Sequence, residues 1–375
     1  MSPKKQTARP VQSAESAEAI AGIDQFLAIA GMKPGKRATL TGSWDQGERI
    51  PRAERRQLVA PKPVKRKAIR PNALDVVRAA ALQKAGVAHG FSTRPGGVSR
   101  VYRPWLAAGD GDLNLSWTKE DDAPLVAENR RRFLSAAANK KSQLVTLRQS
   151  HSPIVHVIRK GTGKDRYSVN GKAYRALATA DDRAVLRGDA AMTNLSGLLL
   201  GIQTADCIPI LLTDKKSGAV AAFHAGWRPT LARIVERGVG RMRLEYGTDP
   251  KNIVAAIGPG IGPCCYAVGE EVRFEFESQF EYWRSLFTEV YDEDPVKTKY
   301  PLLFLTARAP GHSSIGPQIH LNLWEANRQQ LLAAGVPEKN ITVTGLCTAC
   351  HTERFFSHRA EHGFTGRMLN VIGRA

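Results

Sequence analysis

Most of the chain after about residue 74 alternates short apolar runs with polar turns. Six of these runs have the continuous apolar character and the short length of buried strands. Between the last two runs, apolar positions from Leu231 to Met242 recur with a helical period, and a second helix is predicted over 323–334, before the stop signal at 335–337. Strands mixed with few helices predict an α/β fold, a mixed α+β layered sandwich. The predicted strands are Leu144–Leu147, Ile154–Ile158, Gly197–Ile202, Ile208–Leu212, Val220–His224 and Ile253–Ile257.

The same pattern predicts one globular domain. Residues 1–70 are poor in aromatic residues and rich in Pro, Lys and Arg, so we expect a basic extension of low order, followed by a single globular domain over 71–375. Two segments inside this domain, 159–187 and 273–317, are predicted to be insertions. Near the start of the domain we expect a short helix over Leu74–Leu82, a strand at His89–Ser92, a turn at Arg94–Val98 and a helix at Ala127–Ala138.

Charge is distributed unevenly along the chain. The formal net charge is +19, and residues 1–70, with 15 Lys/Arg against 6 Asp/Glu, carry nearly half of it. The densest basic run, residues 61–70, is typical of a solvated tail. Such a run also binds nucleic-acid phosphates or serves as a nuclear address, so both interpretations stay open.

Targeting and redox signals favour a soluble cytoplasmic protein. No apolar run approaches the roughly 18 residues of a membrane span, and no apolar stretch of signal-peptide type follows residues 1–5. The five cysteines include one adjacent pair and one C-x-x-C, a pattern unlike a secreted disulfide framework. We therefore expect reduced thiols and no membrane partner.

Three potential metal ligands stand at the ends of predicted strands. His151 follows one apolar run, Cys207 follows another, and His224 ends a third. Zinc takes Cys and His ligands, and a catalytic site keeps one position open for water or substrate. The neighbouring Asp206 is a candidate group for proton transfer. Each residue taken alone also fits a buried core position, so the spacing leaves the metal interpretation open.

Two further segments predict contacts with an anionic or closely bound ligand. Arg228 lies beside a predicted helix start, where free amides and the helix dipole favour anions, although simple capping explains the same residues. The loop at 257–266 has three glycines and two prolines within six residues, so its backbone, at Gly260 and Gly262, can approach a ligand closely. Its spacing does not match a dinucleotide or phosphate-loop motif.

The C-terminal region carries one more cysteine motif. Cys347 and Cys350 form a C-x-x-C that is typical of half a zinc knuckle or of a redox pair. A structural zinc site usually needs a second pair, and we expect none here, so we predict a structural role for both thiols. Farther along, Arg359 and Arg367 either meet an anionic substrate or lie at the surface.

Several of these motifs together resemble the laccase-domain family, whose members are variously named polyphenol oxidase or purine nucleoside phosphorylase. The resemblance covers roughly residues 75–375 in family order and does not extend to residues 1–70. It rests on Phe91–Ser99, Asn114–Ser116, Gln149-Ser150-His151, Thr204-Ala205-Asp206-Cys207, His224–Arg228, the loop at 258–268 and the stretch at 347–367.

This resemblance implies a layered α/β domain in which His151, Cys207 and His224 hold zinc. It also implies phosphorolysis of purine nucleosides, with adenosine deamination and methylthioadenosine phosphorolysis at the same site. Purine nucleosides and phosphate are therefore the expected small-molecule partners.

Further roles follow from the same hypothesis. We expect Asp206, Cys207 and His224 to take part in catalysis, Arg94 and Arg228 to hold phosphate, and Gly260 and Gly262 to contact the substrate. The chain departs from the family pattern at Pro229, Ala267 and Asn322, and these differences bear on the anion pocket and on substrate choice.

Three other functions stay open. A multicopper oxidase needs many imidazoles, typically in His-x-His pairs, whereas this chain has nine His and no such pair, so Cu²⁺ is less favoured than Zn²⁺. A cysteine hydrolase would use Cys207 as nucleophile and His224 as base. A nucleic-acid-binding protein would use the basic residues 1–70 and would leave the His/Cys/His set unexplained.

Overall fold

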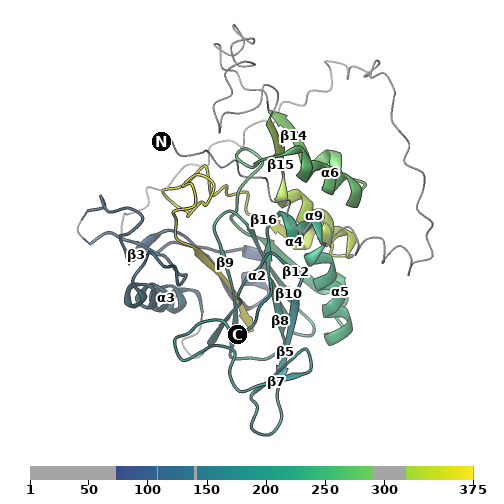
Figure 1. Cartoon of the computed structure of the whole chain (residues 1–375). Coiled ribbons are helices and arrows are strands. Elements are labelled where there is room, and N and C mark those ends of the chain that lie inside the picture. The colour runs from purple at the N-terminus through teal and green to yellow at the C-terminus, as the bar shows by residue number, and fades with distance from the viewer. Residues whose placement is uncertain (1–72, 108, 139–141, 291–317, 375) are drawn as a thin grey trace, which may run out of the picture. The chain divides into compact units, whose positions relative to one another are not determined.

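Two large β-sheets form the frame of the part of the chain that the computed structural model describes, which is residues 73–107, 109–138, 142–290 and 318–374 (Figure 1). The five-stranded sheet has the order β1 (Val76–Val77), β2 (Val87–Ser92), β17 (Met368–Arg374), β9 (Leu198–Thr204) and β4 (Gln143–Thr146). The eight-stranded sheet has the order β16 (Ile341–Val343), β12 (Ile253–Ile257), β10 (Ile208–Asp214), β11 (Val220–Ala225), β8 (Ala190–Thr193), β5 (Val155–Lys160), β6 (Tyr167–Val169) and β7 (Lys172–Tyr174).

A small third sheet and several helices complete the described part of the domain. The third sheet has the order β13 (Ala267–Val268), β15 (Gln318–Leu321) and β14 (Phe287–Val290), while β3 (Pro95–Ser99) stands outside these three sheets. The helices are α2 (Ala80–Lys84), α3 (Ala123–Ala137), α4 (Trp227–Leu231), α5 (Ile234–Tyr246), α6 (Glu270–Gln279) and α9 (Leu323–Ala333), with short 3₁₀ turns η2 (Pro250–Asn252), η3 (Trp283–Leu286) and η4 (Glu338–Asn340).

Strand β10 shows why the eight-stranded sheet lies inside the domain. Ile210 belongs to the core cluster that includes Val235 of α5, whereas the next residue, Leu211, belongs to the cluster that includes Leu200 of β9. Successive side chains of a strand point to opposite faces, so one face packs against the helices and the other against the five-stranded sheet. Burial of both faces explains the continuous apolar runs of the sequence.

The outer face of the five-stranded sheet is covered by α3. Phe133 of this helix packs in one cluster with Leu199 of β9 and Val371 of β17. In Figure 1, α3 lies on one side of the sheets, and α4, α5, α6 and α9 lie on the other. The described residues thus form a layered, mixed α/β domain, which confirms the predicted fold class.

Two local predictions near residue 75–100 are wrong. The segment predicted as a helix from Leu74 begins with strand β1, because Val76 and Val77 pair with β2, and α2 starts only at Ala80. The predicted turn at 94–98 is instead strand β3. Its glycines serve close packing, since a Cβ at Gly97 would lie 2.1 Å from the backbone oxygen of Asp112.

The two predicted insertions differ in how much of them is described. The segment 159–187 adds β6 and β7 at the edge of the eight-stranded sheet. The described part of the second segment, 273–290, contains the end of α6, η3 and β14, while 291–317 and the predicted extension lie outside the described residues.

The domain boundary at residue 70 stays a prediction. None of the described helices combines the length and the apolar character needed to span a bilayer.

Candidate metal centre and substrate cavity

Three chain segments bring His151, Cys207 and His224 together. His151 lies in the loop after β4, Cys207 lies in the loop that links β9 to β10 and so connects the two large sheets, and His224 lies near the end of β11. Their ligand atoms all lie within 4.8 Å of one another, with 3.8 Å between Cys207 Sγ and His151 Nε2. Gly226 permits this approach, because a Cβ there would lie 2.9 Å from Cys207 Sγ.

Asp189, fully buried directly before β8, orients two of the three residues. Its Oδ1 accepts hydrogen bonds from Nδ1 of His224 at 2.8 Å and from the backbone N–H of His151 at 3.0 Å. Its Oδ2 accepts from the backbone N–H and the hydroxyl of Ser152, both at 2.7 Å. A carboxylate at Nδ1 fixes the tautomer of an imidazole, so Nε2 of His224 is left to bind a metal.

Asp189 was not among the site residues predicted from the sequence. The available signal was a carboxylate placed directly before the apolar run Ala190-Ala191-Met192, where a buried acid needs several hydrogen-bond donors.

Electrostatic coupling within this cluster favours an ionised thiol. Burial opposes the charge of Cys207, but His224 and His151 lower the pKa of its thiol to about 6. Burial also opposes protonation of His224, but the Cys207 sulfur and Asp189 raise the pKa of its imidazole to about 9. Hydrogen bonds from His224 and Ser152 outweigh burial at Asp189 and hold the pKa of its carboxyl well below its usual range. The thiolate form of Cys207 and the imidazolium form of His224 therefore stabilise each other.

This donor set fits zinc. Zn–N bonds of about 2.0–2.1 Å and Zn–S bonds of about 2.3 Å place two tetrahedral ligand atoms roughly 3.5 Å apart. The separation of 3.8 Å between Cys207 Sγ and His151 Nε2 is close to that value. Two imidazoles and one thiolate leave a fourth position open, which is typical of catalytic zinc and not of structural zinc.

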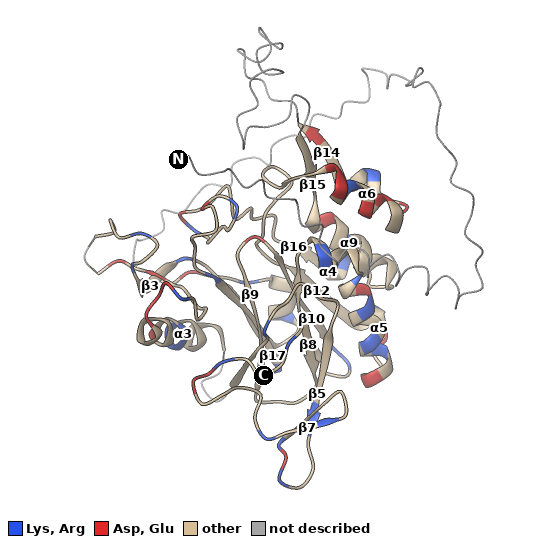
Figure 2. Cartoon of the chain, in the orientation of Figure 1, with Lys and Arg blue, Asp and Glu red and all other residues tan. Residues whose placement is uncertain are grey.

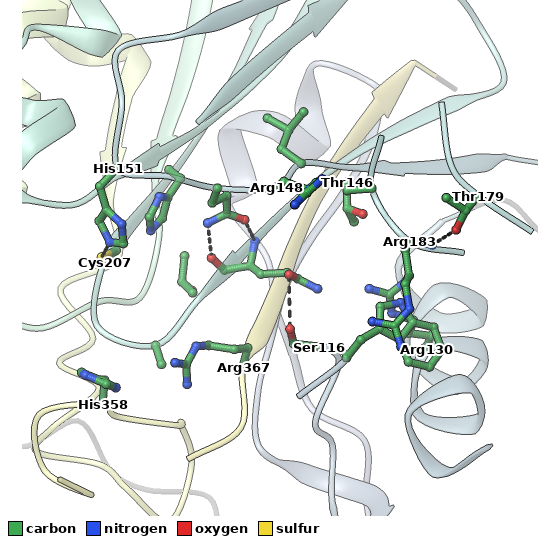
Figure 3. A pocket seen from close by; sticks show the side chains of 18 residues that line it. Ser116, Arg130, Thr146, Arg148, His151, Thr179, Arg183, Cys207, His358 and Arg367 are labelled. Atoms are coloured by element: carbon green, nitrogen blue, oxygen red, sulfur yellow. Dashed lines mark hydrogen bonds between the residues drawn. The ribbon is translucent and has the colours of Figure 1, made fainter. Parts of the chain in front are cut away.

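The three residues line a cavity of about 710 Å³, and Figure 3 shows His151 and Cys207 together at one side of it. In the view of Figure 3, Arg367 and Ser116 lie between this centre and a second group, Arg130 and Arg183. Among the described residues, no carboxylate belongs to the lining, so the cavity is cationic and favours an anionic ligand. The remaining lining residues are Trp117, Thr146, Leu147, Arg148, Gln149, Thr179, Ala184, Gln203, Thr204, Ala205 and His358.

The wall farther from the metal centre combines an arginine with an aromatic ring. Arg130 is buried and its guanidinium lies 4.7 Å from the ring centroid of Trp117. It donates to the backbone oxygen of Leu115 at 3.0 Å and forms an ion pair with Asp182. The guanidinium of Arg183 lies 5.9 Å from the same ring. This wall offers a planar, positively charged surface on which a heterocycle can stack.

A pair of glutamine hydrogen bonds holds the loop that carries His151. The side chain of Gln149 donates to the backbone oxygen of Gln203 at 2.7 Å and accepts from its backbone N–H at 2.8 Å. These bonds tie the segment after β4 to β9, and the positions of Gln149 and His151 in the cavity are thereby coupled.

The structure does not bring Asp206 into the cavity lining. Its Oδ1 accepts from the hydroxyl of Thr348 at 2.7 Å, and its Oδ2 accepts from the backbone N–H of Arg359 at 2.6 Å. The residue has a φ of 85°, which is rare outside glycine. These bonds hold the strained backbone directly before Cys207, so the carboxylate positions the thiol, and its geometry does not suit the expected proton shuttle.

Arg94 and Arg228 also lie outside the cavity lining. Arg94 is 1% exposed, and its guanidinium bonds both carboxylate oxygens of Asp112 at 3.1 Å and Glu361 at 2.7 Å. Arg228 is exposed and its guanidinium lies 4.4 Å from the ring centroid of Trp227. An arginine already paired in the core cannot hold phosphate, so the expected role of Arg94 does not fit its placement.

Gly260 and Gly262 approach protein atoms. A Cβ at Gly260 would lie 2.5 Å from Ile208 Cδ1, and one at Gly262 would lie 2.8 Å from the indole of Trp324. The glycine-rich loop therefore allows close packing inside the domain, and neither glycine belongs to the cavity lining.

Of the cavity arginines, only Arg367 was predicted from the sequence as a possible substrate contact. Arg130 carried a signal, because it stands on the buried stripe of α3 four residues after Val126 and three before Phe133, where an arginine is unexpected. Arg183 lies in the predicted insertion 159–187, which has no periodic pattern to mark it.

Fold and site together define a layered α/β protein with a His/Cys/His metal-type centre beside a cationic cavity. Comparison with known proteins specifies it further. The chain belongs to the family described as multi-copper polyphenol oxidoreductase laccase, which it matches over residues 88–375. This match confirms the family resemblance of the sequence.

Relatives with curated names are similar over most of the chain. A purine nucleoside phosphorylase of Bacteroides thetaiotaomicron is 32% identical over 290 residues, covering 77% of this chain and 92% of the relative. The purine nucleoside phosphorylase YlmD of Geobacillus stearothermophilus is 36% identical, with coverage of 77% and 91%. Adenosine deaminase RL5, from an unknown prokaryotic organism, is 34% identical over 263 residues, with coverage of 70% and 87%. All three are named as enzymes.

Solved structures support the fold. The crystal structure of YlmD from Geobacillus stearothermophilus aligns with a TM-score of 0.58 and 32% identity, covering 79% of this chain and 94% of that one. The hypothetical protein YfiH of Bacillus licheniformis aligns with a TM-score of 0.62 and 27% identity, with coverage of 82% and 98%.

Proposed function

We propose that this protein is a zinc-dependent purine nucleoside phosphorylase that also deaminates adenosine and phosphorolyses methylthioadenosine. The observation that carries the proposal is the convergence of His151, Cys207 and His224 on one side of a cavity whose other walls carry arginines. A nucleoside with phosphate needs room, an anion-binding wall and a surface for a planar base. The cavity volume of about 710 Å³ lies within the range of small-molecule sites.

Phosphate binding is assigned to cavity arginines in place of Arg94 and Arg228. Nη1 of Arg367 donates to the backbone oxygens of Thr365 and Gly366, both at 2.9 Å, so its guanidinium is held in place in the cavity that the metal centre also lines. Arg148 lines the same cavity. Guanidinium groups bind phosphate oxygens with two parallel hydrogen bonds, which fixes both position and orientation.

In phosphorolysis, an oxygen of phosphate attacks C1′ of the sugar while the glycosidic bond breaks and its electron pair passes to the purine. The sugar acquires oxocarbenium character, which the bound phosphate anion stabilises. Arg367 and Arg148 hold the nucleophile, and the ring of Trp117 with Arg130 provides the stacking surface. Zinc bound at the His/Cys/His centre would supply Lewis-acid chemistry to the reacting group. Asp189 keeps His224 in the required tautomer and Asp206 keeps Cys207 in place.

The proposal is tested with the purified full chain, inosine and phosphate. We expect phosphate-dependent release of hypoxanthine, and the same assay with adenosine separates deamination, which yields inosine, from phosphorolysis, which yields adenine. Cys207→Ala should reduce both activities to background. The matched control is His156→Ala, since His156 lies outside the cavity lining. Full turnover by Cys207→Ala would contradict the assignment.

A second assay tests the phosphate site. Arg367→Gln should raise the KM for phosphate about 10- to 100-fold, the effect of losing a hydrogen bond from a charged group. The control is Arg241→Gln, which changes an exposed arginine that pairs with Glu245 on α5. An unchanged KM for phosphate in Arg367→Gln would remove this residue from the binding site.

One alternative has a specific observation in its favour. The thiolate–imidazolium pair of Cys207 and His224 is also the arrangement of a cysteine hydrolase. Turnover by metal-free protein without phosphate would support that alternative, and stoichiometric copper with oxidation of phenols would support an oxidase.

We also propose a cytoplasmic location, because all five cysteines are free thiols and Cys207 must stay reduced to bind a metal.

A further inference from the structure

The described residues contain a second group of potential metal ligands, made only of cysteines. Cys264, Cys265, Cys347 and Cys350 lie with their sulfur atoms all within 4.8 Å of one another. The proposed nucleoside chemistry does not use them, and none of the four lines the substrate cavity. The expectation that the C-x-x-C has no second pair is wrong, because the adjacent pair Cys264-Cys265 supplies it.

Sheet topology explains why the two pairs meet although about 85 residues separate them in the sequence. Strands β12 and β16 pair in parallel, with Ala255 opposite Ile341 and Ile257 opposite Val343, so both strands end at the same edge. The segments that follow remain joined. Gly260 donates to the backbone oxygen of Leu346, and Thr348 donates to that of Gly260, both at 3.1 Å.

The sulfur separations fit one tetrahedral ion. The Sγ atom of Cys350 lies 3.4 Å from that of Cys264 and 3.3 Å from that of Cys265. Zn–S bonds of about 2.3 Å give tetrahedral edges of about 3.8 Å, which the observed separations, from 3.3 Å to at most 4.8 Å, bracket. An iron–sulfur cluster would need iron and sulfide atoms between the thiolates, and this arrangement leaves no room for them.

The surroundings of Cys347 also suit a metal-bound thiolate. Its sulfur accepts a hydrogen bond from the backbone N–H of Gly262 at 3.2 Å, and the side chain is buried. Hydrogen bonds from backbone N–H groups to sulfur are the usual outer contacts of thiolate sites, because they offset the charge that the sulfurs add. Gly262 gives this contact the space it needs, since a Cβ there would lie 3.2 Å from Cys264 Sγ and closer still to Trp324.

We propose that Cys264, Cys265, Cys347 and Cys350 form a second metal site that binds one divalent ion of the zinc type in a structural role. Four thiolates fill a tetrahedral coordination shell and leave no open position, so this site holds structure and does not catalyse. The bound ion would clamp the loop after β12 to the segment after β16.

The clamp acts on the first metal centre through Asp206. Ile261, in the loop after β12, donates its N–H to the backbone oxygen of Asp206 at 2.8 Å. Thr348, inside the C-x-x-C, donates its hydroxyl to the carboxylate of Asp206 at 2.7 Å. Asp206 directly precedes Cys207, so both clamped segments hold the strained backbone that presents this ligand. The cysteine site therefore positions the His/Cys/His centre.

The test counts metal in the purified full chain, isolated under reducing conditions with zinc. We expect two equivalents of zinc in the unmodified protein, and one in each of two variants, Cys207→Ser and the double variant Cys264→Ser/Cys350→Ser. Cobalt substitution distinguishes the remaining sites. Cys207→Ser should keep the intense sulfur-to-cobalt absorption of four thiolates, and the double variant should lose most of it.

Thiol protection tests the site without a mutation. Cys264 and Cys350 are exposed, so alkylation should reach them quickly in the absence of a metal. In the zinc-loaded protein we expect both to resist alkylation until a chelator is added, as mapped by mass spectrometry. Rapid alkylation of the zinc-loaded protein, an unchanged zinc content in the double variant, a disulfide among the four residues, or acid-labile sulfide would each overturn the proposal. These readouts do not depend on turnover, so they stand or fall separately from the phosphorylase assignment.

Discussion

Asp189 and Asp206 are both buried carboxylates near the metal centre, and their hydrogen-bond partners give them different tasks. Asp189 accepts from an imidazole and from three successive residues of the His151 loop. Asp206 accepts from the C-terminal segment and holds the backbone before Cys207. At the scale of single residues, the chemistry of the site thus depends on which donors surround each acid.

Replacing Asp189 with asparagine tests its orienting role. Asparagine has one acceptor oxygen and an NH₂ group that would face N–H donors, so we expect zinc affinity at the His/Cys/His centre to fall about 10- to 100-fold. A competition titration with a chromophoric chelator measures this change. The control is Asp214→Asn, since Asp214 is equally buried but caps a turn at the far end of β10. Equal zinc affinities in the two variants would contradict the role of Asp189.

His89 provides a pH-dependent contribution to stability. It is fully buried, its Nε2 accepts from the backbone N–H of Ala79 at 3.1 Å, and burial lowers its pKa below the ordinary 6.5, with Arg78 adding to the effect. The folded state thus excludes a proton that the unfolded state binds. As pH falls below about 6.5, the free energy of unfolding should decrease by at most about 1.4 kcal/mol per pH unit until the folded-state pKa is reached.

Urea unfolding over a series of pH values measures this contribution. His89→Gln keeps an acceptor for Ala79 and removes the titration, so its stability should decline less steeply with acid than that of the unmodified protein. Parallel pH profiles for the two proteins would show that His89 does not titrate on unfolding.

At the scale of elements, α5 packs against β11 through a glycine. A Cβ at Gly238 would lie 2.1 Å from Cε1 of Phe223, a fully buried ring of β11, whereas a Cβ at Gly240 would meet nothing within 4 Å. The stripe from Leu231 to Met242 was predicted as one helix, but the structure divides it, because Leu231 ends α4, Arg233 has a φ of 58° and α5 begins at Ile234. Within α5, the two glycines look alike in sequence.

The two glycines should therefore respond in opposite directions to alanine. Gly240→Ala should raise the free energy of unfolding by up to about 1 kcal/mol, because alanine is the better helix former. Gly238→Ala should lower it by about 1–3 kcal/mol, because overpacking against Phe223 outweighs the gain in helix propensity. Denaturant unfolding of both variants measures the difference, and changes of the same sign would contradict the packing argument.

Charged residues show the limit of element-level prediction. In Figure 2, Lys and Arg are distributed over helices such as α5 and over strands and loops. Arg94 and Arg130 are both buried, but Arg94 is enclosed by carboxylates and Arg130 lines the cavity. The sequence shows the charge of each residue and gives no indication of its partner, which explains why Arg94 was selected and Arg130 was not.

At the scale of the whole molecule, all residues of the two candidate metal sites and of the cavity lie between Ser116 and Arg367. We therefore expect a chain beginning at residue 71 to retain phosphorolysis and its melting temperature.

The same truncation removes nearly half of the net charge of +19. If the basic segment binds phosphate backbones, the full chain should bind duplex DNA with a steep salt dependence that the truncated chain loses. Fluorescence anisotropy across a salt series measures both, and equal binding by the two chains would assign any affinity to the domain.

The sequence by itself determined the buried strands, the main helices, the family and the positions of His151, Cys207 and His224 at strand ends. These features are local, because hydrophobic periodicity and strand ends are properties of neighbouring residues. Only the tertiary structure decided that Asp189 orients the histidines, that Arg367 faces the cavity while Arg94 is enclosed, and that four distant cysteines meet. Those relations depend on which strands pair, and β12 and β16 become neighbours only when the eight-stranded sheet forms.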